Sequence, residues 1–503
     1  MSAPPARVPG AATSAEATAT AEANDLAEPP WPRRRVAAIA ALLTIGAALV
    51  RALARPGRPM WGDEAFTLAL VRYPHDEIRE FLTHREVNGG IYTLLLHALL
   101  SLTDALGVDP LAAARGLSAL LGVASVPALY LLARRLAGER AALLAGLLLA
   151  VNLFHVGYSL EARAYTLAVL LVILSSSALI SLLDEPRWSR ALLFGLLAGL
   201  ATWAHLFAAL VLAGQGLAAL AHPRLRSAPA APLGGLALGG ALSLAVMARG
   251  AWGDGGQVVW VGALGWDQLT MLLWRLSGGV RLLLAPVAMG LGAALLAMRR
   301  GGRERFRASL SLALLLVPVM VTVLVSTAKP MLVPRYLLVA LPGFLLLAAL
   351  GVASLRRPAL MIGVGLLLAG LGLREVQLDQ FNDPLWQPID TVAARVVALA
   401  RPGDVLVVSH PALALSLDRE LGRLGRGPGP ERVSPVADDL LDLHGDRRPP
   451  LTERVRGHRG LLFVLFAEQP QSAQLREALA AEGATVTADE TYLDVRLLRL
   501  ERR

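Results

Sequence analysis

The chain has 503 residues, of which 55% are hydrophobic and only 17% are charged. Soluble domains carry about 25% charged residues, so the composition argues against a soluble globular protein and indicates a polytopic membrane protein. The net charge of +9 comes almost wholly from arginine, in short clusters between apolar segments. This pattern is typical of topology signals rather than of nucleic-acid binding. The absence of cysteine excludes disulfides, thiolate metal sites and cysteine nucleophiles.

The N-terminal segment 1–35 is predicted to be a disordered cytoplasmic tail, because 1–30 is rich in Ala, Pro, Thr and Glu and lacks an apolar period. An arginine triplet, Arg33 to Arg35, then precedes the first apolar run, 36–54. The end of this run, Ala52-Leu53-Ala54, also fits a signal-peptidase site. An uncleaved first span is preferred, because ten further apolar segments follow.

Eleven apolar stretches approach or exceed the ~20 residues that a membrane-spanning helix needs. They lie at 36–54, 115–133, 141–157, 164–183, 191–205, 206–221, 231–248, 279–298, 308–326, 336–354 and 358–373. A shorter stretch, 91–106, is interpreted as an interfacial helix. With this choice nearly all arginine clusters fall on the cytoplasmic side, as the positive-inside rule requires, with the N-terminus inside and the C-terminus outside.

This topology gathers polar side chains from five segments on the outer face, which predicts a single site there. The first outer loop is long, 55–114, and includes the interfacial helix. The polar residues on the outer side are Asp63, Glu64, Glu86, Glu161, Arg163, His205, Lys329, Arg335 and Tyr336. Charged groups beside hydrocarbon usually face a cavity and have a function.

The C-terminal segment 374–503 is more charged and has Pro- and Gly-rich loops, which predicts a small α/β domain outside the membrane. Helices are expected at 389–400, 413–423 and 472–482. Strands are expected at 405–408, 461–466 and 492–500. The segment contains no nucleotide-binding fingerprint.

Four short motifs on the outer side carry a family resemblance. They are Trp61-Gly-Asp-Glu-Ala-Phe-Thr, Glu86-Val-Asn-Gly-Gly-Ile-Tyr-Thr-Leu-Leu-Leu-His97, Tyr158-Ser-Leu-Glu-Ala-Arg-Ala-Tyr165 and Pro334-Arg335-Tyr336-Leu337. Through them, residues 36–373 resemble the polyprenyl-phosphate-sugar-dependent glycosyltransferases of the GT-C superfamily. The most similar branch groups bacterial protein O-mannosyltransferases with the lipid A aminoarabinose transferase. The expected fold is an all-α polytopic membrane protein with about 11 transmembrane helices and a small C-terminal extracytoplasmic α/β domain.

The resemblance implies transfer of a hexose or pentose from a polyprenyl-phosphate donor to a hydroxyl or similar acceptor, usually with inversion. Asp63 is the expected general base, and Glu64 is a supporting catalytic residue. The leaving phosphate needs fixed cations, and Arg335 is the first choice because guanidinium pairs with phosphate bidentately. Arg163 and Lys329 are second choices. Many relatives have a lysine in the first outer loop, which this chain lacks; Arg85 is the substitute there.

Substrate-binding or supporting roles are expected for Glu86, Glu161, Tyr165, His205 and Tyr336. Simpler roles stay open for several of these residues: a loop ion pair for Glu161 with Arg163, a helix cap for His205, and interfacial anchoring for Arg335 and Tyr336. The tryptophans between 249 and 278 are interpreted as an interfacial belt rather than a sugar platform.

No cofactor is assigned, and no metal is assigned. A divalent cation, Mg²⁺ or Mn²⁺, stays open because Asp63, Glu64, Glu86, Glu161 and His205 offer oxygen and nitrogen donors. The expected partners are a polyprenyl-phosphate-linked sugar, membrane lipids and a protein, lipid or glycan acceptor, with no nucleic acid. The expected location is the bacterial cytoplasmic membrane, with the active site outside. The alternatives are a polymerase or ligase of lipid-linked glycans and, less favoured, a secondary transporter, which would place polar residues near mid-membrane.

Overall fold

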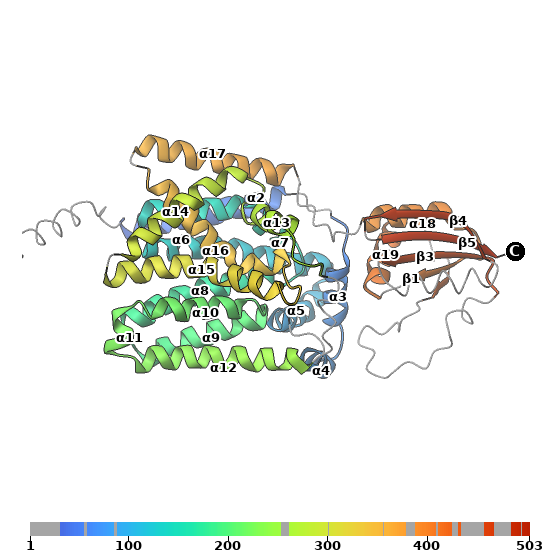
Figure 1. The fold of residues 1–503 in the computed structure, drawn as a ribbon. Coiled ribbons are helices and arrows are strands. Elements are labelled where there is room, and N and C mark those ends of the chain that lie inside the picture. Colours follow the sequence, from blue (N-terminus) through green and yellow to red (C-terminus); the bar gives the residue numbers. More distant parts are fainter. Residues whose placement is uncertain are drawn as a thin grey trace, which may run out of the picture.

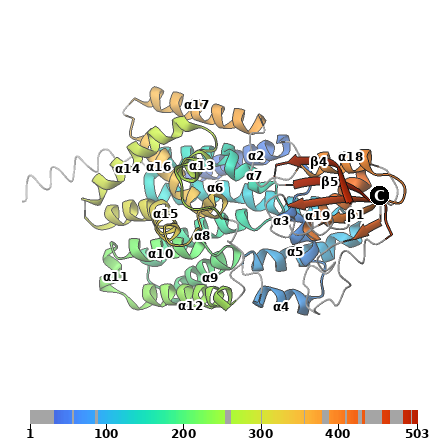
Figure 2. The same ribbon diagram turned by 45° about the vertical axis from the view of Figure 1, so that its right-hand side comes forward.

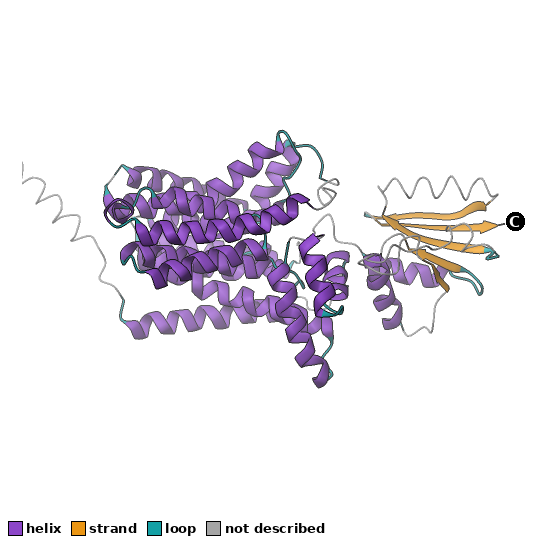
Figure 3. Ribbon diagram, turned by 90° about the horizontal axis from the view of Figure 1, so that it is seen from below, coloured by secondary structure: helices purple, strands orange, loops and turns teal. Residues whose placement is uncertain are grey.

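A computed structural model of the chain describes residues 31–54, 58–84, 88–252, 261–299, 301–355, 357–378, 388–408, 411–424, 431–433, 457–466, 484–493 and 495–502. The described chain forms a bundle of helices followed by a smaller part built on a β-sheet (Figure 1). All the described strands lie in the smaller part, where helices accompany them, and the larger part is helical (Figure 3). Of the predicted tail 1–35, residues 1–30 lie outside the described residues, whereas Arg33 to Arg35 form the first turn of α2 (Arg33–Leu53).

The bundle contains helices α2 to α17 in chain order. The α-helices are α2 (Arg33–Leu53), α3 (Gly62–Leu70), α4 (His75–His84), α5 (Gly90–Thr103), α6 (Pro110–Val151), α7 (Leu153–Ser159), α8 (Tyr165–Asp184), α9 (Trp188–Ala204), α10 (Ala208–Ala219), α11 (Pro223–Ser227), α12 (Ala230–Trp252), α13 (Trp266–Leu276), α14 (Leu284–Met298), α15 (Gly302–Ser326), α16 (Leu341–Ala353) and α17 (Pro358–Gln377). Three short 3-10 helices, η1 (Asp104–Leu106), η3 (Arg281–Leu283) and η4 (Pro334–Ala340), join them.

Helix α6 is a hairpin of two spans rather than one long rod. Its 42 residues would measure about 63 Å if straight, twice the ~30 Å hydrocarbon core, but the backbone breaks at Gly138 with φ 84°. A Cβ placed on Gly146 would lie 3.2 Å from the Cβ of Tyr130, so the segments on either side of Gly138 pack antiparallel. The two predicted spans 115–133 and 141–157 therefore correspond to this hairpin.

The membrane prediction agrees with the helices described. Eight of them are long and apolar enough to span a bilayer, one being the α6 hairpin, and α9 and α10 are shorter apolar helices that match two further predicted spans. The predicted interfacial helix 91–106 corresponds to α5 and η1, and its 14 residues of α-helix cover about 21 Å. The predicted all-α polytopic fold is confirmed.

The two ends of the helix bundle differ in their arginine content. Helix α8 begins at Tyr165 and ends at Asp184, about 30 Å away. At the Asp184 end, Arg135 pairs with Asp184 at 3.2 Å, and Arg190 donates to the carbonyl of Ser181 at 2.8 Å. The arginine-rich turns are therefore at one end of the bundle, and the Tyr165 end is the other.

Small residues bring α14 and α16 into backbone contact, as is typical of helix pairs in lipid. A Cβ on Gly290 would lie 1.8 Å from the carbonyl oxygen of Leu347, and a Cβ on Gly351 would lie 1.9 Å from that of Pro286. Only glycine fits these two positions without moving a backbone.

The C-terminal part is a mixed five-stranded sheet with strand order β2-β1-β3-β5-β4. Its elements are α18 (Ile389–Leu399), β1 (Val405–Val408), α19 (Pro411–Arg423), β2 (Glu431–Val433), β3 (Gly460–Phe466), β4 (Ala484–Tyr492) and β5 (Val495–Arg502). Strand β1 is parallel to β2 and β3, whereas β5 is antiparallel to β3 and β4. Helices α18 and α19 cover one face through a core that includes Leu406, Val408 and Leu417.

The predicted helix 389–400 and the strands 405–408 and 461–466 match α18, β1 and β3. The predicted strand 492–500 begins only at Val495, and β4 was not predicted. Strand β4 carries Asp489 and Glu490 at the edge of the sheet, where charge is favourable, so it lacks the apolar run on which the prediction relied. The predicted helix 472–482 lies outside the described residues.

Helix α19 packs beside α3, so the sheet part contacts the bundle at the Tyr165 end (Figure 2). Arg419 on α19 pairs with Asp109, the N-cap of α6, at 2.9 Å.

Candidate functional site

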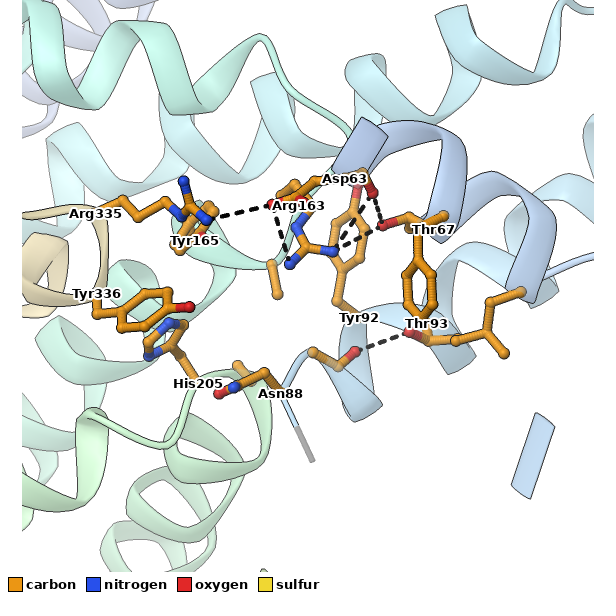
Figure 4. A pocket seen from close by; sticks show the side chains of 15 residues that line it. Asp63, Thr67, Asn88, Tyr92, Thr93, Arg163, Tyr165, His205, Arg335 and Tyr336 are labelled. Carbon is orange, nitrogen blue, oxygen red and sulfur yellow. Dashed lines mark hydrogen bonds and ion pairs between the residues drawn. The ribbon is translucent and has the colours of Figure 1, made fainter. Parts of the chain in front are cut away.

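A cavity of about 190 Å³ lies where α3, α5, α8, η4 and the turn between α9 and α10 meet (Figure 4). Six residues predicted for the site line it: Asp63, Arg163, Tyr165, His205, Arg335 and Tyr336. These residues are up to 273 positions apart in the chain. With Asn88 and Tyr92 of the motif that begins at Glu86 also in its lining, the cavity brings together all four sequence motifs.

Helix α3 presents two acids in its first turn, where the helix dipole favours negative charge. Glu64 points into the protein: its side chain is fully buried and pairs bidentately with Arg115, at 2.7 and 2.8 Å. Glu64 also accepts a hydrogen bond from the backbone N–H of Ala162 at 2.9 Å. It thereby fixes α3 to α6 and to the turn that carries Arg163.

Asp63 points the other way, into the cavity, and faces two guanidinium groups (Figure 4). Its Oδ2 atom is 3.6 Å from Nη2 of Arg163 and 3.8 Å from Nη2 of Arg335. The Asp63 side chain is 33% exposed, whereas that of Arg335 is 7% exposed. The carboxylate is open to a ligand, and Arg335 is held in a low-dielectric environment.

The turn 160–164 fixes Arg163 against α3 and α6. Its Nη1 donates to Oγ1 of Thr67 at 3.2 Å, and its carbonyl oxygen accepts from Oγ of Ser118 at 3.2 Å. The Arg335 guanidinium lies 5.7 Å from the ring centroid of Trp61, which is within cation–π range. Both arginines are therefore oriented by the protein before any ligand binds.

The opposite side of the cavity is aromatic and uncharged. The His205 ring lies 5.5 Å from the ring of Tyr165 and 5.3 Å from that of Tyr336. His205 lies in the turn after α9, and burial lowers its pKa to about 3, with smaller contributions from Arg163 and Arg335. The imidazole is therefore neutral at physiological pH.

A short strap from the first outer loop closes this side. The amide oxygen of Asn88 accepts from the backbone N–H of Leu206 at 3.1 Å, and the N–H of Gly89 donates to the carbonyl of Ala204 at 3.1 Å. Gly89 has φ 78°, a conformation that glycine adopts without strain. The N-terminus of α5 is thus joined to the turn that carries His205.

Three predicted residues are placed outside the lining of the cavity. Glu64 pairs with Arg115, as described above. Glu161 is buried, and it acts electrostatically on Arg115. Lys329 is exposed after the end of α15. Arg85 and Glu86 lie outside the described residues.

The lining also includes polar residues that the sequence interpretation did not single out, namely Thr67, Asn88, Tyr92 and Thr93. Three of them lie in the motif that begins at Glu86, and Thr67 ends the motif that begins at Trp61. The motifs therefore contained these four residues, but the sequence analysis selected mainly charged side chains as site candidates, and these four are uncharged.

The donor set considered for a divalent cation is not assembled in the described residues. No group of three or more His, Asp or Glu side chains there could hold a metal ion. Asp63 and His205 line the cavity, but Glu64 and Glu161 do not.

Comparisons with known proteins agree with this fold. A family model described as dolichyl-phosphate-mannose-protein mannosyltransferase matches residues 93–252, a range that contains Arg163, Tyr165 and His205. The comparison with curated proteins finds no match.

Among solved structures, ArnT from Cupriavidus metallidurans bound to undecaprenyl phosphate is similar with a TM-score of 0.57 and 13% identity, over 93% of this chain and 98% of that one. The apo state of the same protein has a TM-score of 0.53 and 15% identity, over 91% and 97% of the two chains. The oligosaccharyltransferase AglB from Archaeoglobus fulgidus, in complex with an inhibitory peptide and a dolichol-phosphate, has a TM-score of 0.50 and 11% identity, over 91% and 74%. The predicted resemblance is confirmed at the level of the fold, and the mannosyltransferase family model matches the chain over residues 93–252.

Proposed function

We propose that the protein transfers a sugar from a polyprenyl-phosphate donor to a hydroxyl acceptor at the outer face of the bacterial cytoplasmic membrane, with inversion at the anomeric carbon. The observation that carries the proposal is the position of the Asp63 carboxylate between the guanidinium groups of Arg163 and Arg335 in one cavity. A base beside two phosphate-binding cations is the set of groups that this reaction needs.

The two arginines would bind the donor phosphate. With His205 neutral, the charged side chains among the described lining residues are one carboxylate and two guanidinium groups, a net charge of +1. Guanidinium groups bind phosphate bidentately, and Arg335 is the more deeply buried of the two. Positive charge fixed in a water-poor site stabilises the phosphate as it leaves with the electron pair of the sugar–oxygen bond.

Asp63 would act as the general base. The acceptor hydroxyl loses its proton to the carboxylate as its oxygen bonds to the anomeric carbon, and the bond from that carbon to the phosphate oxygen breaks. A single displacement with attack opposite the leaving group inverts the anomeric centre. The donor phosphate and Asp63 interact with the same two arginines, so donor binding would release the carboxylate for the acceptor.

The placement at the outer face is supported by the two ends of the bundle. The cavity lies at the Tyr165 end of α8, and the arginine-rich turns lie at the Asp184 end. Arginine clusters mark the cytoplasmic side of multi-pass proteins. The cavity would then open to the outer face. Because nucleotide sugars are absent there, a lipid-linked donor is required.

The test is a transfer assay with purified protein in lipid nanodiscs, synthetic polyprenyl-phosphate sugars and a panel of hydroxyl acceptors. Release of polyprenyl phosphate is the readout, and NMR of the product gives its anomeric configuration. Asp63→Asn is expected to lose turnover, whereas Asp104→Asn, which removes an acid paired with Arg72 outside the cavity, keeps it. A glycan chain as product would indicate a polymerase or ligase instead. Failure of the wild-type protein to consume any such donor contradicts the proposal.

A further inference from the structure

The first membrane-spanning helix, α2, carries an arginine that is buried inside the bundle. Arg51 lies in the last turn of α2 and is only 3% exposed. An arginine near the end of a span ordinarily extends to the membrane surface, where water solvates its charge. In the part of the chain that the structure describes, Arg51 donates to the carbonyl of Ala47 at 3.0 Å and to Nδ1 of His155 at 2.8 Å, and no carboxylate pairs with it. A buried charge without an opposite charge is costly, which indicates that Arg51 has a function.

His155 connects Arg51 to the short helix α7. A guanidinium group has no acceptor atom, so Nδ1 of His155 is the acceptor in this hydrogen bond. Helix α7 has seven residues, which is too short for a helix to be stable on its own. Its position therefore depends on its contacts with other elements. The carbonyl of His155 in turn accepts from Oγ of Ser159, one turn further along α7, at 2.6 Å.

Helix α6 approaches this group of side chains through a glycine. A Cβ on Gly122 would overlap Oγ of Ser159 and would lie 3.3 Å from Nε of Arg51. One turn earlier on α6, Ser118 donates to the carbonyl of Arg163 at 3.2 Å. Four residues of helix measure about 6 Å. Arg51 therefore lies about one helical turn below the backbone of Arg163.

The turn 160–164 follows α7 directly and carries Arg163 into the cavity. Glu64 holds this turn from the side of α3, through the backbone N–H of Ala162. From the other side the turn is continuous with α7, which Arg51 ties to α2. A displacement of about 1 Å is enough to spoil the geometry of a binding group, so the position of Arg163 depends on both attachments.

We propose that Arg51, together with His155, is a positioning residue for the donor site, because it fixes α7 and thereby the turn that presents Arg163 to the donor phosphate. This inference rests on the proposed function, since the phosphate is that of the same donor. Arg51 does not line the cavity, so it acts through Arg163 and contacts no substrate.

The experiment measures equilibrium binding of polyprenyl phosphate to the full-length protein in nanodiscs. Arg51→Met is expected to raise the Kd about tenfold, the order of one hydrogen bond to a charged group. Its thermal transition is expected to stay close to that of the wild type, because the substitution removes the buried charge together with its hydrogen bonds. His155→Gln keeps an acceptor for Arg51 and is expected to keep the affinity. Arg135→Met is the control, because Arg135 lies at the Asp184 end of the bundle.

Two double variants separate positioning from a general loss of structure. In an Arg163→Ala background, Arg51→Met is expected to have little further effect on the Kd, because the side chain that it positions is absent. In an Arg335→Ala background it is expected to keep most of its effect, because η4 carries Arg335. Equal effects in the two backgrounds, or an unchanged Kd in Arg51→Met alone, overturn the inference.

Hydrogen exchange tests the link to the turn without any ligand. The backbone amides of 160–164 are expected to exchange faster in Arg51→Met than in the wild type, while those of α10 are unchanged. Unchanged exchange in the turn overturns the inference whatever the binding results are. Failure of the wild-type protein to bind polyprenyl phosphate refutes the proposed function, and the role of Arg51 in the donor site with it.

Discussion

Asp63→Asn is predicted to strengthen the binding of polyprenyl phosphate while it abolishes turnover. The substitution keeps the shape of the side chain and removes the charge that lies 3.6 and 3.8 Å from two guanidinium groups. At an effective dielectric constant of 20, one such contact amounts to about 4 kcal/mol. Asp63 is one-third exposed and neither contact has hydrogen-bond length, so we reduce the total to about 1 kcal/mol. This corresponds to a Kd about fivefold lower.

If Asp63 is the general base, as proposed, its loss acts on a different step. General-base catalysis contributes a factor of about 10² to 10⁴, so kcat is expected to fall by that factor in Asp63→Asn. Equilibrium binding of polyprenyl phosphate to protein in nanodiscs measures the first effect, and single-turnover transfer measures the second. Asp104→Asn is the control for both, because its carboxylate pairs with Arg72 and does not line the cavity.

Two results would refute the reasoning. Weaker binding of polyprenyl phosphate by Asp63→Asn would mean that the carboxylate organises the arginines instead of competing with the phosphate. Full turnover in Asp63→Asn would mean that another group, or water, removes the acceptor proton.

Three further predictions concern the residues around the cavity and the bundle. Glu64→Ala leaves Arg115, whose side chain is 15% exposed, without its carboxylate, which is expected to cost about 3 kcal/mol of stability, the lower end for a buried ion pair, and is measured as a lower thermal transition in detergent. Gly290→Ala is expected to destabilise by about 1–3 kcal/mol because its Cβ would overlap a backbone carbonyl of α16; Gly292→Ala, which meets nothing within 4 Å, is the control, and equal transitions would contradict the close packing. Arg335→Ala is expected to raise the donor KM far more than Lys329→Ala, because Lys329 is exposed outside the cavity; the reverse order in steady-state kinetics would move the phosphate site.

The topology was predictable because two physical rules act along the chain without regard to tertiary contacts. Hydrocarbon requires apolar helices of a minimum length, and arginine marks one side. These rules were enough to place Arg163 and Arg335 at one end of the bundle. They also separated the α6 hairpin into its two spans, which meet at the break at Gly138.

The roles of individual acids were less predictable, because adjacent residues of a helix point in different directions. Asp63 and Glu64 are neighbours in the sequence, but helical geometry turns successive side chains by about 100°. One enters the cavity, and the other is buried against Arg115, a residue that the motifs did not mark. Because the two acids are adjacent in the sequence, the sequence analysis expected catalytic roles for both, although their environments differ.

The two acids of α3 nevertheless both help to position Arg163, Glu64 from inside the protein and Asp63 from the cavity. Glu64 holds the backbone of Ala162 and the side chain of Arg115, and so fixes the turn that presents Arg163 to the cavity. Asp63 then opposes Arg163 and Arg335, which would otherwise be two like charges facing one cavity. An anion between the two guanidinium groups offsets their mutual repulsion. The Asp63 carboxylate supplies that anion. In the proposed function the donor phosphate would replace it, and the carboxylate would then become available as the base.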